Sequence, residues 1–172
     1  MIGFSAATTI GLGLLRLCPA LISTTLCINR VGQYFALTSF RPPYMPPDQH
    51  HLAAPVFQRW FRSASGRIWK GVILLTQMQR LLCLANLMVR PSTTIGWWLY
   101  AASFILSNAH LPFVPRLLTA EKKLLGKQQQ APEESLVALQ DWLKVNNIRV
   151  LAVDLPLLLV TTAAALASEN WQ

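Results

Sequence analysis

Ionisable side chains inside long apolar stretches are the part of this sequence most suited to chemistry. Arg80 lies about halfway along one such stretch, His110 ends the next, and Asp154 lies within the last. A charge in hydrocarbon is costly unless it faces a partner or a wet cavity. The simplest arrangement that satisfies both charges is an ion pair between Arg80 and Asp154, and the sequence predicts this pair.

His110 also ends a stripe of polar residues on one predicted helix. Tyr100, Ser103, Ser107 and His110 are spaced i, i+3, i+7 and i+10, which places them on one helix face. Histidine suits proton abstraction near neutral pH, so the stripe indicates a pocket with His110 as a general base. Small and hydroxylated residues also hold membrane helices together, so an interhelical contact is the alternative.

Two further helices bring polar faces of their own. Gln77 and Arg80 share a face of one apolar stretch, and Trp142, Asn146 and Arg149 follow one another at i, i+4 and i+7 before the last stretch. Trp and Arg commonly anchor a helix at the membrane surface, which is one interpretation of the second set. The other is a polar mouth that receives a substrate from the cytosolic leaflet.

Four apolar stretches must position these residues. Hydrophobic residues make up 53% of the chain and charged residues 13%, and a membrane-spanning helix needs about 20 mostly apolar residues. The sequence therefore predicts an all-α fold, an integral membrane four-helix bundle that forms one domain over residues 1–172. The expected spans are about 4–37, 68–89, 94–111 and 148–167. A helix is expected to begin at Pro132 and to continue into the last span, where Pro156 should kink it.

Basic residues gather in two of the connections between these spans. Residues 40–66 and 113–147 hold most of them, whereas the connection at 90–93 holds only Arg90. The positive-inside rule then places 40–66 and 113–147 in the cytosol and both termini on the opposite side. The net charge of +8 is explained by topology and anionic headgroups. We therefore expect a lipid bilayer as partner, no nucleic acid, and an endoplasmic reticulum or other endomembrane location.

Motifs for metal, nucleotide or flavin binding do not occur in the sequence. There is no HExxH, no Gly-rich phosphate loop and no carboxylate-rich helix pair. Cys18, Cys27 and Cys83 form no CxxC pair, and all lie in or beside apolar stretches. The sequence predicts no metal and no cofactor, and it does not indicate an oligomeric state.

Short motifs at the ends of the predicted spans resemble the anthrone oxygenase-like family of small four-span membrane proteins. The segment Trp142-x-x-x-Asn146-x-x-Arg149 leads into the last span, and His110-Leu-Pro-Phe113 ends the third. The segment Trp60-Phe61-Arg62 is similar to the family's entry into the second span. The chain departs from the family pattern at Val114, where the family has a threonine.

The resemblance implies an enzyme that oxidises a small apolar aromatic substrate, an anthrone, to a quinone with O2 and without a cofactor. His110 would be the base, and Arg80 or Arg149 would stabilise the oxyanion. The remaining expected site residues are Asn146, Tyr100, Gln77, Ser107 and Trp142, in a pocket between spans two, three and four. A non-oxidative membrane tailoring enzyme (cyclase, isomerase or dehydratase) and a non-catalytic membrane scaffold are the alternatives.

Overall fold

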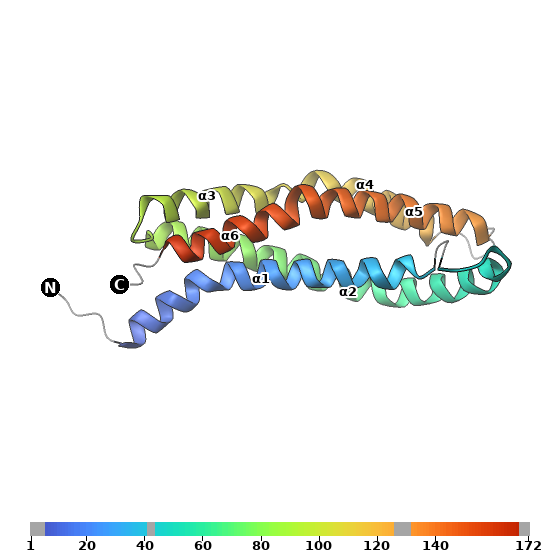
Figure 1. Ribbon diagram of the computed structural model, residues 1–172, viewed down its shortest axis with the longest axis horizontal. Coiled ribbons are helices and arrows are strands. Elements are labelled where there is room, and N and C mark those ends of the chain that lie inside the picture. Colours follow the sequence, from blue (N-terminus) through green and yellow to red (C-terminus); the bar gives the residue numbers. More distant parts are fainter. Residues whose placement is uncertain (1–5, 41–43, 126–131, 169–172) are drawn as a thin grey trace.

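The computed structural model describes residues 6–40, 44–125 and 132–168, and these form an all-α bundle of four long rods (Figure 1). The first two rods are single helices. The third consists of two helices joined by a 3₁₀ turn at Leu111–Phe113, and the fourth of two helices joined by a π-helical turn at Val150–Asp154. The prediction of an all-α four-helix bundle is confirmed. The helices are α1 (Ala6–Thr38), α2 (His50–Val89), α3 (Thr94–Asn108), α4 (Val114–Leu124), α5 (Pro132–Arg149) and α6 (Leu155–Ala167).

Three of the four rods contain helix long and apolar enough to cross a membrane. These segments are Thr9–Thr38, Ala54–Val89 and Glu134–Ala167. Helix α3 has 15 residues, a length of roughly 22 Å against a hydrocarbon core of roughly 30 Å. It is followed by the 3₁₀ turn that contains Pro112. The apolar helix of the third rod is therefore shorter than the other three expected spans.

The helices extend well beyond the spans expected from hydropathy. Helix α2 has 40 residues, which corresponds to roughly 60 Å, about twice the thickness of a hydrocarbon core. Parts of the two expected cytosolic connections, 40–66 and 113–147, are also helical, because α2 begins at His50 and the second connection contains α4 and most of α5. The bundle is therefore longer than a membrane is thick. Along its length it can be divided into a head half, which contains the expected cytosolic connections, and a membrane half.

The head half consists of the end of α1, the first part of α2, α4 and α5, and it is built around large apolar side chains. Phe57, Phe61 and Leu139 are among its buried residues, and the rings of Phe61 and Trp142 meet edge to face at 5.9 Å. Such a core resembles the interior of a water-soluble helical protein. Its buried members are Leu37, Phe57, Phe61, Leu117, Ala120, Leu124, Ala138, Leu139, Trp142 and Leu143.

The membrane half consists of most of α1, the last part of α2, α3 and α6, and it is apolar outside and partly polar inside. Large apolar side chains such as Leu21, Ile105 and Leu159 are exposed on its surface. Inside, Gln79 Nε2 donates a hydrogen bond to Ser23 Oγ at 3.0 Å, and Thr161 Oγ1 donates to the same oxygen at 3.2 Å. Small residues and interhelical hydrogen bonds are typical of helix packing in lipid.

The π-helical turn in the fourth rod lies where the sequence predicts a kink. The Leu155 N–H donates to the Val150 carbonyl, one residue further back than in an α-helix. Pro156, which lacks an N–H, follows at the start of α6. Before the turn α5 packs against α4 and α2, and after it α6 packs against α3 and α1. The expected helix from Pro132 into the last span is confirmed.

Candidate functional site

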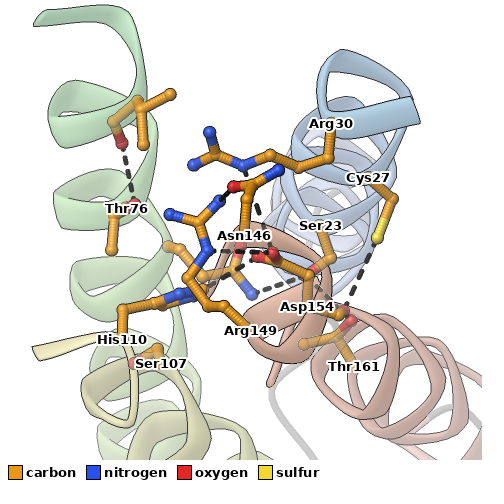
Figure 2. A network of polar contacts seen from close by, with 12 residues as sticks. Ser23, Cys27, Arg30, Thr76, Ser107, His110, Asn146, Arg149, Asp154 and Thr161 are labelled. Atoms are coloured by element: carbon orange, nitrogen blue, oxygen red, sulfur yellow. Dashed lines mark hydrogen bonds and ion pairs between the residues drawn. The ribbon is translucent and has the colours of Figure 1, made fainter. Parts of the chain in front are cut away.

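A buried carboxylate at the junction of the two halves joins side chains from three rods. Asp154 Oδ2 lies 3.5 Å from Arg149 Nε and 4.0 Å from Arg30 Nε, and Asp154 Oδ1 lies 3.6 Å from His110 Nε2. Figure 2 shows Arg30 reaching in from α1, His110 from the end of α3, and Arg149 and Asp154 from the fourth rod. All four residues are buried or nearly so. They are called the polar centre below.

Several polar atoms of this centre have no hydrogen-bond partner. Among the described residues these atoms include Arg30 Nε, His110 Nε2, Arg149 Nε and both carboxylate oxygens of Asp154. Buried polar groups are nearly always hydrogen-bonded, and each unpaired one costs about 1–3 kcal/mol. The ion pairs hold the side chains near one another but leave their hydrogen-bonding capacity unused. A bound water or ligand oxygen would recover part of that loss.

Local contacts hold the two arginines of the centre in place. Arg149 Nη2 donates to Asn146 Oδ1 at 2.6 Å, three residues earlier on α5. Arg30 Nη1 donates to Gln33 Oε1 at 3.4 Å, and Gln33 Nε2 donates to Asn29 Oδ1 at 3.2 Å. Each guanidinium is thus oriented from its own helix. Asn146 therefore orients Arg149, and it is not part of the walls of the two pockets described below.

The predicted ion pair between Arg80 and Asp154 is wrong. The Nε and Nη2 atoms of Arg80 both donate to the Ser107 carbonyl at 3.3 Å, and Nη1 donates to Gln77 Oε1 at 3.3 Å. Carbonyl groups near the C-terminus of a helix such as α3 lack partners and attract cations. The charge of Arg80 is stabilised by that carbonyl, while Asp154 forms ion pairs with Arg30 and Arg149.

Two pockets adjoin the polar centre. The polar pocket holds a cavity of about 100 Å³, and the aromatic pocket one of about 30 Å³. They share Arg30, Trp69, Val72 and Arg149 in their walls. Gln77, Arg80 and His110 complete the polar side of the first pocket, and the aromatic wall of the second is formed by Trp60, Phe61, Trp69 and Trp142.

Four of the expected site residues line the polar pocket, namely Gln77, Arg80, His110 and Arg149. A fifth, Trp142, lines the aromatic pocket. The expectation of a pocket between spans two, three and four needs one correction, because α1 also contributes to it. The helical extensions of the head half form much of the aromatic pocket.

Tyr100 and Ser107 are not brought to either pocket. The Tyr100 hydroxyl donates to the Arg16 carbonyl at 2.8 Å, and the Ser107 hydroxyl donates to the Phe104 carbonyl at 2.7 Å. Both side chains are fully buried on α3, which packs against α2 and α6. The Tyr100 contact is interhelical, as in the alternative, whereas the Ser103 and Ser107 hydroxyls donate to carbonyls of α3 itself. Of the stripe, His110 lines the polar pocket.

Arg30, Trp69 and Glu121 are residues of the site that sequence analysis missed. Arg30 interrupts an apolar stretch together with Asn29, and that interruption was the available signal. Glu121 is buried and accepts a hydrogen bond from the Trp69 indole N–H. It lies in the expected cytosolic connection, where a carboxylate gives no such signal.

The fold and the site define a class of all-α bundle with three membrane-length rods and a buried, positively charged centre beside an aromatic pocket. The chain is 36% identical over 164 residues to two proteins called "Oxaleimides biosynthesis cluster protein N", from Penicillium oxalicum and from its strain 114-2. The alignment covers 94% of this chain and 93% of each relative. The chain therefore belongs to the family of the oxaleimides biosynthesis cluster protein N. No family model and no solved structure matches it.

Proposed function

We propose that this protein is an integral membrane enzyme that modifies an apolar intermediate of secondary metabolism. Its relatives carry the name of a biosynthesis cluster, and three of its rods are of membrane length and composition. An apolar intermediate dissolves in the bilayer and enters the pockets from there. The enzyme lies in the endoplasmic reticulum or another endomembrane, with the head half in the cytosol.

The observation that carries this proposal is the contact between His110 and Asp154 beside three arginines. His110 Nε2 lies 3.6 Å from Asp154 Oδ1, and Arg30, Arg80 and Arg149 line the same pocket as His110. A histidine that takes a proton becomes positively charged, and the neighbouring carboxylate stabilises that charge. The arginines stabilise the oxyanion that forms on the substrate. The centre thus has the groups needed to remove a proton next to a carbonyl.

The resemblance to anthrone oxygenase-like proteins supplies the reaction. His110 removes a proton from the central methylene of an anthrone-like substrate, and the electron pair moves into the ring system as a phenolate. The phenolate reduces O2. One oxygen atom remains on the former methylene carbon as the new quinone carbonyl, and the other leaves as water. The anthrone loses two hydrogen atoms and gains one oxygen, so one O2 is consumed for each molecule of quinone and of water formed.

A second candidate is a cyclase, isomerase or dehydratase that uses the same residues without O2. The acid–base pair of His110 and Asp154 favours it, because proton transfer alone is sufficient for those reactions. The non-catalytic scaffold is the third candidate, and the unpaired polar atoms of the centre weigh against it.

The test is turnover of emodin anthrone by the purified protein in nanodiscs, with and without O2. We expect quinone formation with an equal uptake of O2, and a rate lower by about 100-fold or more in His110→Ala. His51→Ala is the matched control, because His51 is exposed on α2. Normal turnover by folded His110→Ala would remove His110 as the base. Conversion of a substrate without O2 would favour the second candidate, and no turnover of any substrate would favour the third.

The orientation in the membrane has a separate test. Cysteine introduced at Lys123 in the head half should react with a membrane-impermeant reagent only from the cytosolic side. Cysteine at Arg90, in the turn at the far end of the membrane half, should react only from the opposite side. Labelling of both positions from one side would contradict the proposed topology.

A further inference from the structure

We propose that the two pockets form one cleft that binds a molecule with a single oxyanion on an aromatic body, and that Arg30 binds the oxyanion. This inference rests on the proposed function only in taking the pockets as a substrate site. It names the chemical class of the ligand and assigns a role to a residue that sequence analysis did not place in the site.

The two pockets lie side by side and share part of their walls. Arg30 and Arg149 belong to both of them, as do Trp69 and Val72. The guanidinium groups therefore stand where the polar and aromatic parts meet. Both cavities are smaller than a typical small-ligand site of about 300–1,000 Å³, so a ligand enters by moving side chains of the walls apart. A ligand that fills both must be charged near its middle or one end and apolar elsewhere.

The charge of the cleft calls for an anion. Three arginines line the polar pocket, and its described wall contains no acidic side chain. Asp154 pairs with Arg30 and Arg149, and Glu121 is bound to the Trp69 indole, so at least one of the three positive charges is not offset. Arg30 is 5% exposed, and its Nε lies 4.0 Å from Asp154 Oδ2 without a hydrogen bond. A carboxylate, enolate or phenolate oxygen in the pocket would pair with the Arg30 guanidinium as a charge-assisted hydrogen bond.

The lining of the aromatic pocket indicates that the rest of the ligand is aromatic. Four aromatic side chains give it flat walls suited to rings. Glu121 accepts from the Trp69 indole and so fixes the ring that the two pockets share. The Trp142 indole N–H is buried without a partner. It would donate to a second oxygen on the ligand body, such as a ketone or hydroxyl.

The experiment measures binding to the wild-type protein in nanodiscs, with empty nanodiscs subtracted. Anthraquinone-2-carboxylate is compared with its uncharged counterpart, anthraquinone-2-carboxamide. We expect the carboxylate to bind about tenfold or more tightly, as a charge-assisted hydrogen bond to a buried arginine requires. Arg30→Gln should abolish this preference. Arg67→Gln, at an exposed position on α2, should keep it.

A second variant tests the aromatic pocket and remains informative if Arg30→Gln does not fold. Trp142→Phe keeps a ring but removes the N–H, so it should weaken binding of anthraquinone-2-carboxylate several-fold. It should leave anthracene-2-carboxylate, which has no ketone, unchanged. Equal affinity of wild type for carboxylate and carboxamide would overturn the proposal, as would a preference that survives Arg30→Gln. Neither measurement needs O2 or turnover. Selective binding without oxidation would therefore contradict the proposed oxygenase activity and still support the proposed binding site.

Discussion

The two halves of the bundle are built from the same four rods, yet their interiors differ in polarity. The head half surrounds residues such as Phe57 and Leu139 with other large apolar groups. The membrane half buries Ser23, Gln79 and Thr161 against one another. In water, burial of apolar surface drives helices together. In lipid that gain is absent, so close packing and hydrogen bonds take its place.

The polar centre lies where these two modes of packing meet. Arg30 lies within α1, His110 and Arg149 lie at helix ends, and Asp154 of the π-helical turn is the acid that joins them. A site at such a boundary can receive an apolar molecule from one side and polar reactants from the other. The difference between the halves can be tested by substitution, beginning with the centre itself.

Asp154→Asn should have the largest effect on stability. It leaves Arg30 and Arg149 buried without a counter-ion, and loss of one partner from a buried pair costs about 3–5 kcal/mol. The measurement is unfolding of the protein in nanodiscs or detergent. Asp141→Asn is the control, because Asp141 is exposed on α5. Equal losses in the two variants would mean that the charges of the centre do not depend on Asp154.

Leu139→Ala should destabilise the head half more than Leu157→Ala destabilises the membrane half. Both leucines are essentially fully buried. In the head half we expect a loss of about 2–5 kcal/mol, since both the transfer term and the cavity term apply. In the membrane half the unfolded helix remains in lipid, so mainly packing is lost. Equal free energies of unfolding for the two variants would contradict the distinction between the halves.

Gly96→Ala should destabilise the contact between α3 and the end of α6. An added Cβ would lie 3.0 Å from Thr93 Oγ1, 3.1 Å from Pro91 Cβ and 3.2 Å from Ser168 Cα. Overpacking of this kind costs about 1–3 kcal/mol. Gly71→Ala on α2 is the control, since its Cβ would meet nothing within 4 Å, and it should gain about 0.5–1 kcal/mol. The two changes should therefore shift the unfolding midpoint in opposite directions.

The hydrogen bond between Gln79 and Ser23 should have the smallest effect. Such bonds between membrane helices average about 0.6 kcal/mol. A double-mutant cycle with Gln79→Leu and Ser23→Ala isolates the coupling between the two side chains. A coupling of several kcal/mol would show that hydrogen bonds dominate the membrane half.

The rods could be predicted from the sequence because long apolar stretches nearly always form membrane-spanning helices. The head half was predicted only in part: the helix from Pro132 was expected, but α4 was not, since it mixes charged residues with leucines and its hydropathy resembles that of a loop. His110 and Arg149 were found because charge near hydrocarbon is expensive. Their partner Asp154 was assigned to Arg80, because pairing depends on how each rod is rotated, and that rotation has no local signal.

The stripe on α3 shows a related limit. Periodicity established that Tyr100, Ser103 and Ser107 share a face, and the structure buries all three. It could not establish what that face contacts. Arg30 shows the opposite case, since its interruption of an apolar stretch was visible but its distance in sequence from Asp154 hid the contact between them.

The extra residue of the π-helical turn rotates α6 about the axis of the fourth rod relative to α5. One residue corresponds to ~100° of helical rotation, so the buried face of α6 is turned by about a quarter circle from that of α5. The rod therefore leaves α2 and meets α1. The polar pocket opens where it departs, between Arg80 on α2 and Arg149 at the end of α5. The cavity thus forms because α5 and α6 follow one another along the same rod but direct their buried faces to different neighbours.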